Sequence, residues 1–233
     1  MIKAVLIDVD NTLLDFDEYV KYAMKIGFEK FGYREYEDWM YDEFCLINNG
    51  FWGAYEKGEI AYEDIMKNRW NKVFEKVGIV GDGIEFEKFF KDTLFFNAIL
   101  IDGAIETLEY LSKKYIVCTA TNGPYLQQLN RLKISGIDKF ITHNFISEEM
   151  GVAKPDNAFF ALALDRINEK QRENKEKELS FDNLIMIGDS LSSDMLGAKN
   201  SGIKTCFFDK NNRNKPFPYD FKITKLIQIK DIL

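Results

Sequence analysis

The feature of this 233-residue sequence that most constrains its fold is a series of short apolar runs. The runs contain β-branched residues, show no polar alternation and are too short to be helices, so they predict buried strands of a parallel sheet. They cover residues 3–9, 115–120, 184–187 and 205–208, with a weaker run at 140–142.

Segments with helical periodicity separate these runs. Residues 104–111 and 155–167 are amphipathic, with Pro155 suited to a first helical turn, and residues 192–200 form a third such segment. Strands that alternate with helices predict an α/β fold, in which a doubly wound, Rossmann-type parallel sheet is covered by helices on both faces.

The alternation is interrupted between residues 16 and 100, where the sequence has helical periodicity and many aromatic residues but no convincing buried strand. We therefore expect a core made of residues 1–15 and 101–233, with residues 16–100 inserted after the first strand as a helical cap domain. Two polar stretches have simpler interpretations. Residues 168–180 are a charged helix end or solvated loop, and residues 210–218 are a polar loop.

The chain is acidic, because 38 Asp and Glu residues against 31 Lys and Arg residues give a formal net charge of −7. Proteins that coat nucleic acid need clustered basic residues to neutralise phosphates, so this balance argues against a nucleic-acid polymer as partner. It is compatible with a small phosphorylated ligand when a divalent cation lies between the ligand and the carboxylates.

The cysteines and the N-terminus indicate the compartment. Cys45, Cys118 and Cys206 are far apart with no CxxC spacing, so neither a zinc site nor a disulfide framework is expected. The apolar N-terminal run is stopped by Asp8 and is too short for a signal-peptide core or a membrane span. We expect a cytoplasmic protein that does not contact a membrane.

Four short polar segments follow the predicted strands, at the edge where open α/β sheets bind their ligands. The first contains Asp8 and Asp10, followed by Asn11. Residues i and i+2 of an extended strand point to the same side, so the two carboxylates face one site. One can serve as nucleophile or metal ligand while the other holds a proton for a leaving group. Taken alone, the pattern fits a plain acidic turn about as well.

The second segment consists of Thr121, Asn122 and Gly123. A hydroxyl, an exposed backbone N–H and a glycine can cradle an anion, although most such segments are simple turns. The third is Lys154, which precedes the N-terminus of a predicted helix, where the helix dipole already favours an anion. Most isolated lysines of this kind are exposed loop residues.

The fourth segment contains Asp189, at the end of the strand predicted at 184–187, and Asp194, one turn into the next helix. Together they can bind one hard cation, since Mg²⁺ typically takes one or two carboxylates along with water and phosphate oxygens. Ser190 and Ser192 also fit the simpler role of helix caps.

The four segments occur in one order, which is far more specific than any of them alone. Because these four segments match its ordered motifs, residues 2–209 resemble the haloacid dehalogenase superfamily of phosphohydrolases. The segments at residues 8–16, 48–60, 121–123, 151–160, 188–203 and 205–208 are similar to its pyrimidine 5′-nucleotidase subgroup. The resemblance implies a Mg²⁺-dependent phosphoric monoester hydrolase that forms an aspartyl-phosphate, acts on a nucleoside monophosphate and works as a monomer or homodimer.

The resemblance also implies catalytic roles. Asp8 attacks phosphorus, and Asp10 protonates the leaving oxygen and later activates the hydrolytic water. Thr121 holds a phosphoryl oxygen, and Lys154 offsets charge in the transition state. The dehalogenases of the superfamily have no acid at the position of Asp10, so the resemblance speaks against dehalogenation.

Binding residues are implied in the same way. The metal site would consist of Asp8, the main-chain carbonyl oxygen of Asp10, and Asp189, with Asp194 ordering the site through water or Lys154. The remaining predicted substrate-binding residues are Asn11, Asn122, Gly123, Phe16 and Phe51.

Selectivity is expected to come from the insert, because the core handles only the phosphoryl group. Phe16 lies at the exit from the nucleophile loop, and Phe51 belongs to an aromatic stripe with Trp52 and Tyr55. Aromatic rings can stack on a nucleobase, but stripes at helical spacing are more often core, which we favour for Trp52 and Tyr55.

Three other polar residues have weaker cases. Asn49 and Arg69 are candidates for polar contacts of the cap with a substrate, and His143, the only histidine, is expected to be structural.

Three other functions stay open. The chain could be a phosphatase for another small metabolite, such as a sugar phosphate or phosphoglycolate. It could be a phosphomutase of the same fold, which net phosphate release would distinguish from a hydrolase. It could also be a binding protein without chemistry, although the presence of Asp8, Asp10 and Lys154 weighs against that.

Overall fold

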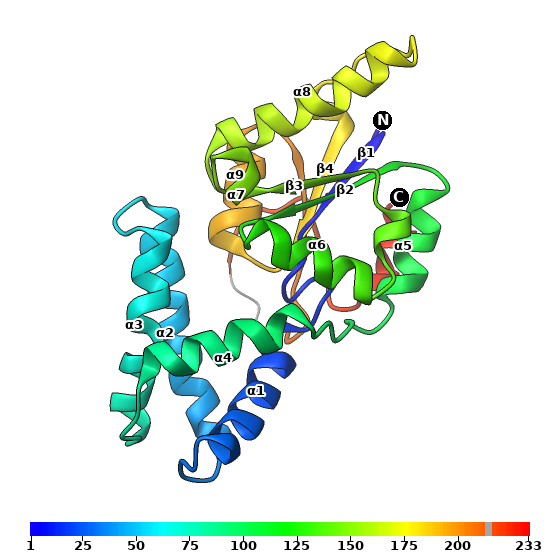
Figure 1. Ribbon diagram of the computed structural model, residues 1–233. Helices are drawn as coiled ribbons and strands as arrows, with labels where there is room; N and C mark the ends of the chain where they lie inside the picture. Colours follow the sequence, from blue (N-terminus) through cyan, green and yellow to red (C-terminus); the bar gives the residue numbers. More distant parts are fainter. Residues whose placement is uncertain (213–215) are drawn as a thin grey trace. The chain divides into compact units, whose positions relative to one another are not determined.

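The computed structural model describes residues 1–212 and 216–233, so the polar loop predicted at residues 210–218 lies partly outside the described residues. Within them, six parallel strands form one sheet in the order β3-β2-β1-β4-β5-β6 (Figure 1). The strands are β1 (Ala4–Ile7), β2 (Ile116–Thr121), β3 (His143–Ile146), β4 (Leu184–Gly188), β5 (Lys204–Phe208) and β6 (Phe221–Ile223). In the centre, Leu6 of β1 lies opposite Cys118 of β2 and Met186 of β4. The predicted parallel α/β sheet is confirmed.

Both differences from the predicted strands concern the edges of this sheet. The weaker run at 140–142 is not a strand, because Asp138–Phe140 form a 3₁₀ turn and β3 follows from His143. His143 is therefore a strand residue, and its ring stacks on that of Phe145 with centroids 5.8 Å apart. The opposite edge strand, β6, was not predicted. An edge strand has a neighbour on one side only and needs no continuous apolar run, so its sequence signal is weak.

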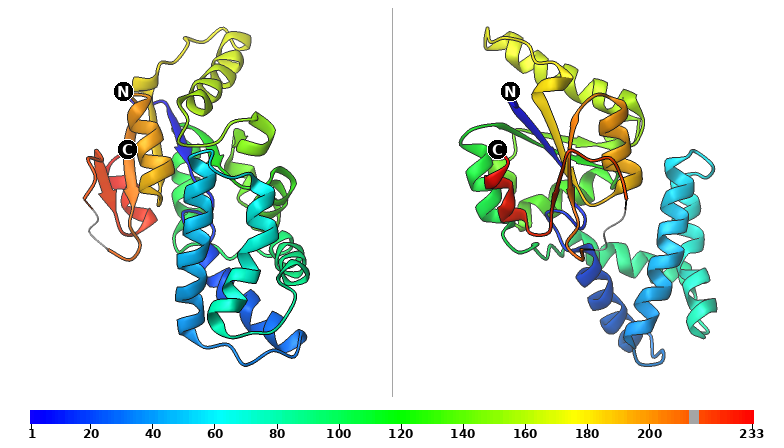
Figure 2. Two further views of the ribbon diagram at one scale, coloured as in Figure 1. Left: turned by 90° about the vertical axis from the view of Figure 1, so that its left-hand side faces the viewer. Right: turned by 180° about the vertical axis from the view of Figure 1, so that it is seen from behind.

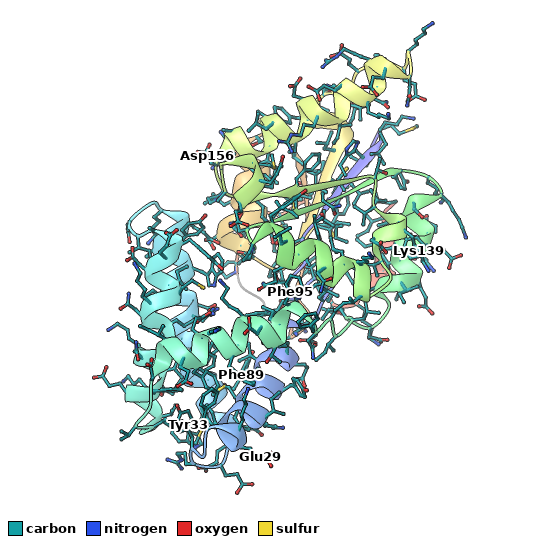
Figure 3. All side chains as sticks on the ribbon, in the orientation of Figure 1. Glu29, Tyr33, Phe89, Phe95, Lys139 and Asp156 are labelled. Atoms are coloured by element: carbon teal, nitrogen blue, oxygen red, sulfur yellow. The ribbon has the colours of Figure 1, made fainter. Side chains whose placement is uncertain are left out.

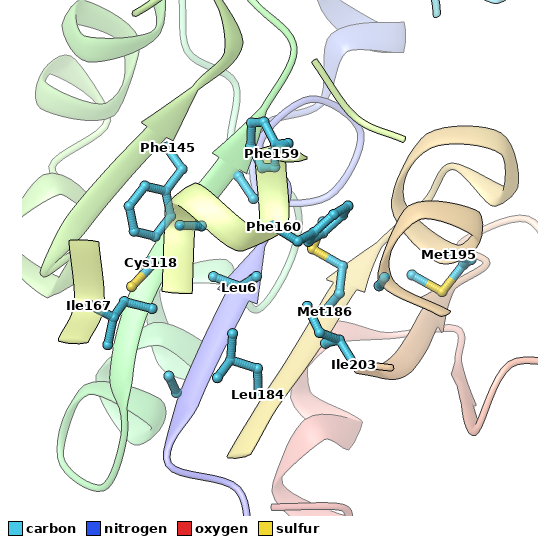
Figure 4. Close-up of a cluster of buried hydrophobic side chains, with 14 of the residues drawn as sticks. Leu6, Cys118, Phe145, Phe159, Phe160, Ile167, Leu184, Met186, Met195 and Ile203 are labelled. Carbon is cyan, nitrogen blue, oxygen red and sulfur yellow. The ribbon is translucent and has the colours of Figure 1, made fainter. Parts of the chain in front are cut away.

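Helices cover both faces of the sheet (Figure 2). On one face, α8 (Asn157–Glu173) and α9 (Leu196–Asn200) pack on alternate residues of the central strands, where Leu6 and Met186 meet Phe159 and Phe160 (Figure 4). Right-handed crossovers place α5 (Ala104–Ser112) and α6 (Tyr125–Ile134) on the other face. The short helix α7 (Ser147–Met150) follows β3.

The helix after Lys154 begins and ends later in the chain than predicted. Pro155 precedes the helix instead of starting it, and Asp156 caps α8 by accepting a hydrogen bond from the Ala158 N–H (Figure 3). The helix then continues to Glu173, so the first part of the charged stretch 168–180 is helical. The Asn168 side chain ties the end of that stretch back to α8 through two hydrogen bonds with the backbone of Leu179.

The chain divides into two compact units, residues 1–15 with 99–233 and residues 16–98. All residues of the second unit are described, and they form only helices and connecting turns: α1 (Phe16–Lys30), α2 (Asp38–Glu56), α3 (Tyr62–Val77) and α4 (Gly83–Phe95). Among the described residues of the whole chain, no helix combines the length and apolarity needed to cross a membrane.

An aromatic core holds the second unit together. The Trp70 ring is 1% exposed, and its centroid lies 4.5 Å from that of Phe86 and 5.2 Å from that of Phe90. Tyr33 and Phe89 also contact the Phe86 ring (Figure 3). Aromatic rings in such tilted and edge-on pairs bury large apolar areas with favourable geometry. The unit therefore has a core of its own.

Trp52 and Tyr55 belong to a smaller aromatic group. Their rings contact each other, and both contact Tyr62, with centroid distances of 5.6 to 6.3 Å. Both rings are half-buried, in agreement with the packing role favoured for them.

Arg69, predicted as a possible substrate contact, is instead part of this interior. It is 3% exposed, and its guanidinium makes a two-point ion pair with Glu87, with Nη2 2.8 Å from Oε1 and Nε 3.2 Å from Oε2. Its Nη1 donates to the Asn48 side-chain oxygen at 2.8 Å. A guanidinium held on all these sides has a structural role, so the contact predicted for it is wrong.

Replacing Arg69 by methionine is expected to lower the free energy of unfolding by about 3–5 kcal/mol, because Glu87 would keep a buried charge without its partner. Urea denaturation measures the change. Lys21→Met, which removes a partly exposed pair with Glu18, is the control and should cost less than about 1 kcal/mol. Equal small losses in both variants would show that the buried pair contributes nothing.

Candidate active site

The first site segment begins where β1 ends, in the centre of the sheet. The Asp8 N–H donates to the Ile187 carbonyl of β4 at 2.9 Å, which continues the sheet pairing, and the Asp8 residue is 7% exposed. Directly afterwards the chain turns, with Leu13 and Leu14 both donating to the Val9 carbonyl. Asn11 takes a left-handed conformation with φ 59° in this turn, which asparagine tolerates better than most residues. The turn leaves Asp8 and Asp10 at the carboxyl edge of the sheet.

Lys154 is buried at the centre of the site. Its side chain is 2% exposed, and Nζ donates to Asp8 Oδ1 at 2.8 Å, to Asp194 Oδ1 at 2.5 Å and to the Ala120 carbonyl at 2.6 Å. Three acceptors use all three donors of an ammonium group. The alternative of an exposed loop lysine is therefore excluded.

Asp194 is fixed on both of its oxygens. Oδ1 accepts from Lys154, and Oδ2 accepts from the Ser190 N–H at 3.0 Å. Gly188 makes this approach possible, because a Cβ at that position would lie 2.1 Å from Asp194 Oδ2. Ser190 caps the following π-helical turn, Leu191–Met195, by accepting from the Ser193 N–H, as the simpler interpretation expected.

The carboxylates of Asp8, Asp189 and Asp194 form the acidic cluster of the described residues, with one oxygen from each lying within 4.8 Å of the others. All three offer hard oxygen ligands, the donor type that Mg²⁺ prefers over nitrogen or sulfur. The donor set therefore fits the implied cation. The Asp10 carboxylate is outside this cluster, and the contribution of its main-chain carbonyl oxygen stays a prediction.

For each of the two paired groups, Asp8 and Lys154, burial and the neighbouring charges act on the pKa in opposite directions. Burial raises the pKa of the Asp8 carboxyl above its ordinary value, although the nearby Lys154 opposes that shift. For Lys154, burial alone would lower the pKa, but the Asp194 and Asp8 carboxylates outweigh it and the pKa lies above its ordinary value. Lys154 is thus a fixed positive charge, and a further cation beside Asp8 would favour its ionised form.

The second site segment follows β2. Thr121 is 2% exposed, and its Oγ1 accepts from the Gly123 N–H at 3.3 Å. The Asn122 side chain makes two hydrogen bonds with the backbone of Lys154, donating to its carbonyl at 2.8 Å and accepting from its N–H at 2.9 Å. Asn122 therefore locks the loop that carries Lys154 onto the end of β2, a contact that the sequence did not reveal.

Two residues that the sequence analysis did not select lie beside Asp10. Arg131 Nη1 is 2.6 Å from Asp10 Oδ1, and Gln128 Nε2 donates to Asp10 Oδ2 at 2.8 Å. Both come from α6, a segment for which no element was predicted. The available signal was their i, i+3 spacing directly after the Thr121–Gly123 turn, but the leucines at positions 126, 129 and 132 have the same spacing and suggest an apolar buried face instead.

The structure brings together Asp8, Asp10, Thr121, Lys154, Asp189 and Asp194, all in the first unit, with Asn11, Asn122 and Gly123 next to them in the chain. Phe16 and Phe51 belong to the second unit. Phe16 is half-buried against the rings of Tyr19 and Phe90, and Phe51 is half-buried on α2. Their contact with a substrate stays a prediction.

Comparison with known proteins identifies the same architecture. The family model for haloacid dehalogenase-like hydrolases matches residues 2–202. The putative HAD-hydrolase YfnB of Bacillus subtilis is 30% identical over 99% of this chain and 95% of its own length. A crystal structure of YfnB bound to magnesium superimposes with a TM-score of 0.87 and 28% identity, covering 100% of this chain and 98% of YfnB.

Two enzymes with stated substrates are also similar. The pyrimidine 5′-nucleotidase PynA of Streptococcus pneumoniae is 29% identical over 90% of this chain and 85% of its own length. A glyceraldehyde 3-phosphate phosphatase of Pyrococcus furiosus is 27% identical over 100% of this chain and 93% of its own length.

Proposed function

Because this chain belongs to the family of haloacid dehalogenase-like hydrolases, we propose that it hydrolyses nucleoside 5′-monophosphates, above all those of pyrimidines, through a phosphoryl group carried by Asp8. The observation that most supports the chemistry is the position of Asp8. It ends the central strand of a parallel sheet, pairs with a buried lysine, and lies in a cluster of three carboxylates. This arrangement provides a nucleophile, a fixed positive charge and hard oxygen ligands at one point.

In the first step, an Asp8 oxygen attacks phosphorus and the bond from phosphorus to the leaving oxygen breaks. A protonated Asp10 carboxyl gives its proton to that oxygen, which leaves as the alcohol. In the second step, Asp10 takes a proton from water, the water oxygen attacks phosphorus, and Asp8 is released with inorganic phosphate. Each step moves one proton through Asp10, in accord with general acid and base catalysis.

The other residues hold the phosphoryl group. Thr121 Oγ and the backbone N–H of Asn122 would donate to its oxygens, with Asn11 and Gly123 beside it, and Lys154 would stabilise the charge of the transition state. Mg²⁺ would be held by Asp8, the Asp10 carbonyl oxygen and Asp189, with Asp194 fixed in place by Lys154. When bound, it supplies positive charge against the phosphate oxygens. The second unit would act as the cap and supply contacts to the nucleoside.

The substrate proposal rests on the relatives and on the insert. PynA is a pyrimidine 5′-nucleotidase and shares most of its length with this chain. The proposal is tested by phosphate release from UMP, dTMP, AMP, glucose 6-phosphate, phosphoglycolate and glyceraldehyde 3-phosphate, each with Mg²⁺ and with excess EDTA. Mg²⁺-dependent release that is fastest with UMP or dTMP is the expected result. Faster release from AMP or from a non-nucleotide than from UMP and dTMP would overturn the proposed substrate. No phosphate release from any compound would overturn the proposal that the protein is a hydrolase.

One observation favours a second candidate, a phosphatase for a small sugar phosphate. The Pyrococcus furiosus relative acts on glyceraldehyde 3-phosphate and aligns with the whole of this chain. The same residues of the first unit would serve that reaction, so only the substrate panel separates the two proposals.

Phe51 provides a test of nucleobase contact. If its ring stacks on the base, Phe51→Ala should raise KM for UMP about tenfold or more, which is the loss of about 1–3 kcal/mol of stacking. The KM for p-nitrophenyl phosphate should change less than twofold. Trp39→Ala, which removes an exposed ring elsewhere on α2, is the control. Equal changes in KM for both substrates would show that Phe51 only packs within its own unit.

Mg²⁺ binding should be measurable without turnover. A ligand that binds only the folded state stabilises it, by about 2.7 kcal/mol at a hundredfold excess over Kd, so Mg²⁺ should raise the melting temperature. Asp189→Asn should abolish this rise, while Asp182→Asn, an exposed residue before β4, should keep it. An unchanged rise in Asp189→Asn would exclude Asp189 as a ligand.

A further inference from the structure

The buried polar side chains of α6 are not explained by the proposed chemistry. Gln128 is 0% and Arg131 1% exposed, whereas Leu126 on the same helix is 71% exposed. Burying an amide and a guanidinium costs free energy unless their hydrogen bonds are satisfied, and exposing leucine gains nothing in return. Leu132 of this helix is buried as well, so α6 keeps part of an apolar face, and the two buried polar side chains beside it meet Asp10.

Asp10 is held on both of its carboxylate oxygens by these two residues. Arg131 Nη1 contacts Oδ1 at 2.6 Å, and Gln128 Nε2 contacts Oδ2 at 2.8 Å. Arg131 Nη1 also donates to Gln128 Oε1 at 2.8 Å, so the two side chains fix each other. Rotation of the Asp10 carboxylate would break both contacts, although its side chain is 31% exposed.

Gln128 also connects Asp10 to the segment proposed to bind phosphate. Its Nε2 donates to Thr121 Oγ1 at 2.8 Å, and the same oxygen accepts from the Gly123 N–H. A hydroxyl oxygen that accepts two hydrogen bonds has its own hydrogen left to donate, which is the role proposed for Thr121 toward a phosphoryl oxygen.

The turn itself is shaped for Gln128. A Cβ on residue 123 would lie 2.6 Å from Gln128 Nε2 and 2.8 Å from its Cδ, so glycine leaves the space that the amide occupies. Position 123 therefore needs a glycine to make room for the Gln128 side chain, in addition to the close approach of an anion predicted for it.

We propose that Gln128 and Arg131 are positioning residues that hold the Asp10 carboxyl in line with the leaving oxygen and couple its position to that of Thr121. The proposal rests on the proposed function, since it takes Asp10 to be the proton donor. Proton transfer requires heavy atoms about 2.6–3.2 Å apart, and displacement of a reacting group by about 1 Å can cost about a hundredfold in rate. In the first step, displacement of Asp10 therefore lowers the rate only to the extent that the leaving oxygen needs a proton. In the second step, where Asp10 activates water, it affects both substrates alike, and loss of Gln128 also removes a contact of Thr121 that both substrates share.

Two substrates of similar size separate that requirement from binding. Benzyl phosphate releases an alkoxide that must be protonated, whereas p-nitrophenyl phosphate releases a stable phenolate. In a single turnover, Arg131→Met should lower the rate of benzyl alcohol release about a hundredfold and the rate of p-nitrophenol release less than about fivefold, because the leaving group departs before Asp10 activates water. Gln128→Met should likewise slow benzyl alcohol release more than p-nitrophenol release. Arg131→Lys keeps the charge and should recover part of the loss. Lys133→Met, an exposed position on the same helix, should change neither rate.

A double-variant measurement shows whether the effect passes through Asp10. Asp10→Asn alone should also slow the reaction of benzyl phosphate more than that of p-nitrophenyl phosphate. Adding Arg131→Met to it should not widen this difference between the two substrates. The Mg²⁺-induced rise in melting temperature should persist in every folded variant. Should Arg131→Met not fold, Gln128→Met and Arg131→Lys carry the same comparison.

The outcomes separate the inference from the function on which it rests. If Asp10→Asn slows the single-turnover release of both leaving groups equally, or the wild type hydrolyses neither substrate, the assignment of Asp10 as proton donor fails and the inference fails with it. If Asp10→Asn is selective but the Arg131 and Gln128 variants lose both substrates equally, or lose nothing, the inference alone is overturned.

Discussion

Asp8→Asn is expected to lower the rate of phosphate release on the order of 10⁴-fold or more, because the substitution removes the nucleophile and leaves no second group in its place. Asn has nearly the same size as Asp, and Lys154 keeps its contacts with Asp194 and the Ala120 carbonyl. Phosphate release from UMP under saturating Mg²⁺ measures the loss.

The same variant should not be less stable than the wild type. Burial raises the pKa of Asp8, which means that the ionised carboxylate is held at a cost in its site, and a neutral amide does not bear this cost. Urea denaturation in the absence of Mg²⁺ is the measurement. Asp182→Asn, at an exposed position, should retain both activity and stability. Near-normal turnover by Asp8→Asn would remove the proposed mechanism.

Lys154→Met is expected to have the largest effect on folding as well as abolishing turnover. Lys154 lies between two carboxylates that are themselves at least nine-tenths buried, and its removal leaves both without their shared cation. Breaking a buried ion pair by removing one partner typically costs about 3–5 kcal/mol. Urea denaturation without Mg²⁺ measures the loss of unfolding free energy.

Mg²⁺ gives this variant an internal control. A divalent cation bound by the same carboxylates would replace part of the missing positive charge, so it should stabilise Lys154→Met by more than it stabilises the wild type. Lys113→Met removes an exposed pair with Glu109 and should leave the free energy of unfolding nearly unchanged. A loss no greater than that of Lys113→Met would show that Lys154 does not neutralise the site.

The central part of the fold could be predicted from the sequence because each strand in the interior of the sheet has a continuous apolar sequence. Strands β1, β2, β4 and β5 lie in the interior of the sheet, covered by helices, and each coincides with a predicted run. The edge strands β3 and β6 contain polar residues such as His143 and Lys222, so their runs are interrupted and were misplaced or missed.

The position of the site could be predicted for a related reason. Carboxyl ends of parallel strands meet at one edge of a sheet, so residues far apart in sequence, such as Asp8 and Asp189, are brought together by topology alone. This rule does not predict which face of a neighbouring helix is directed at the site. Gln128, Arg131 and Arg69 are buried polar residues whose partners come from other elements, and no local pattern distinguishes them from solvated side chains.

The most direct test of the central claim is to trap the covalent intermediate. Wild-type protein turning over ³²P-labelled UMP with Mg²⁺ would be quenched in acid within milliseconds to seconds and digested. The account predicts label that is released by hydroxylamine, as expected of an acyl phosphate, and that maps to the peptide containing Asp8. Label on any other side chain, or phosphate release with no protein-bound label at any quench time, would contradict it.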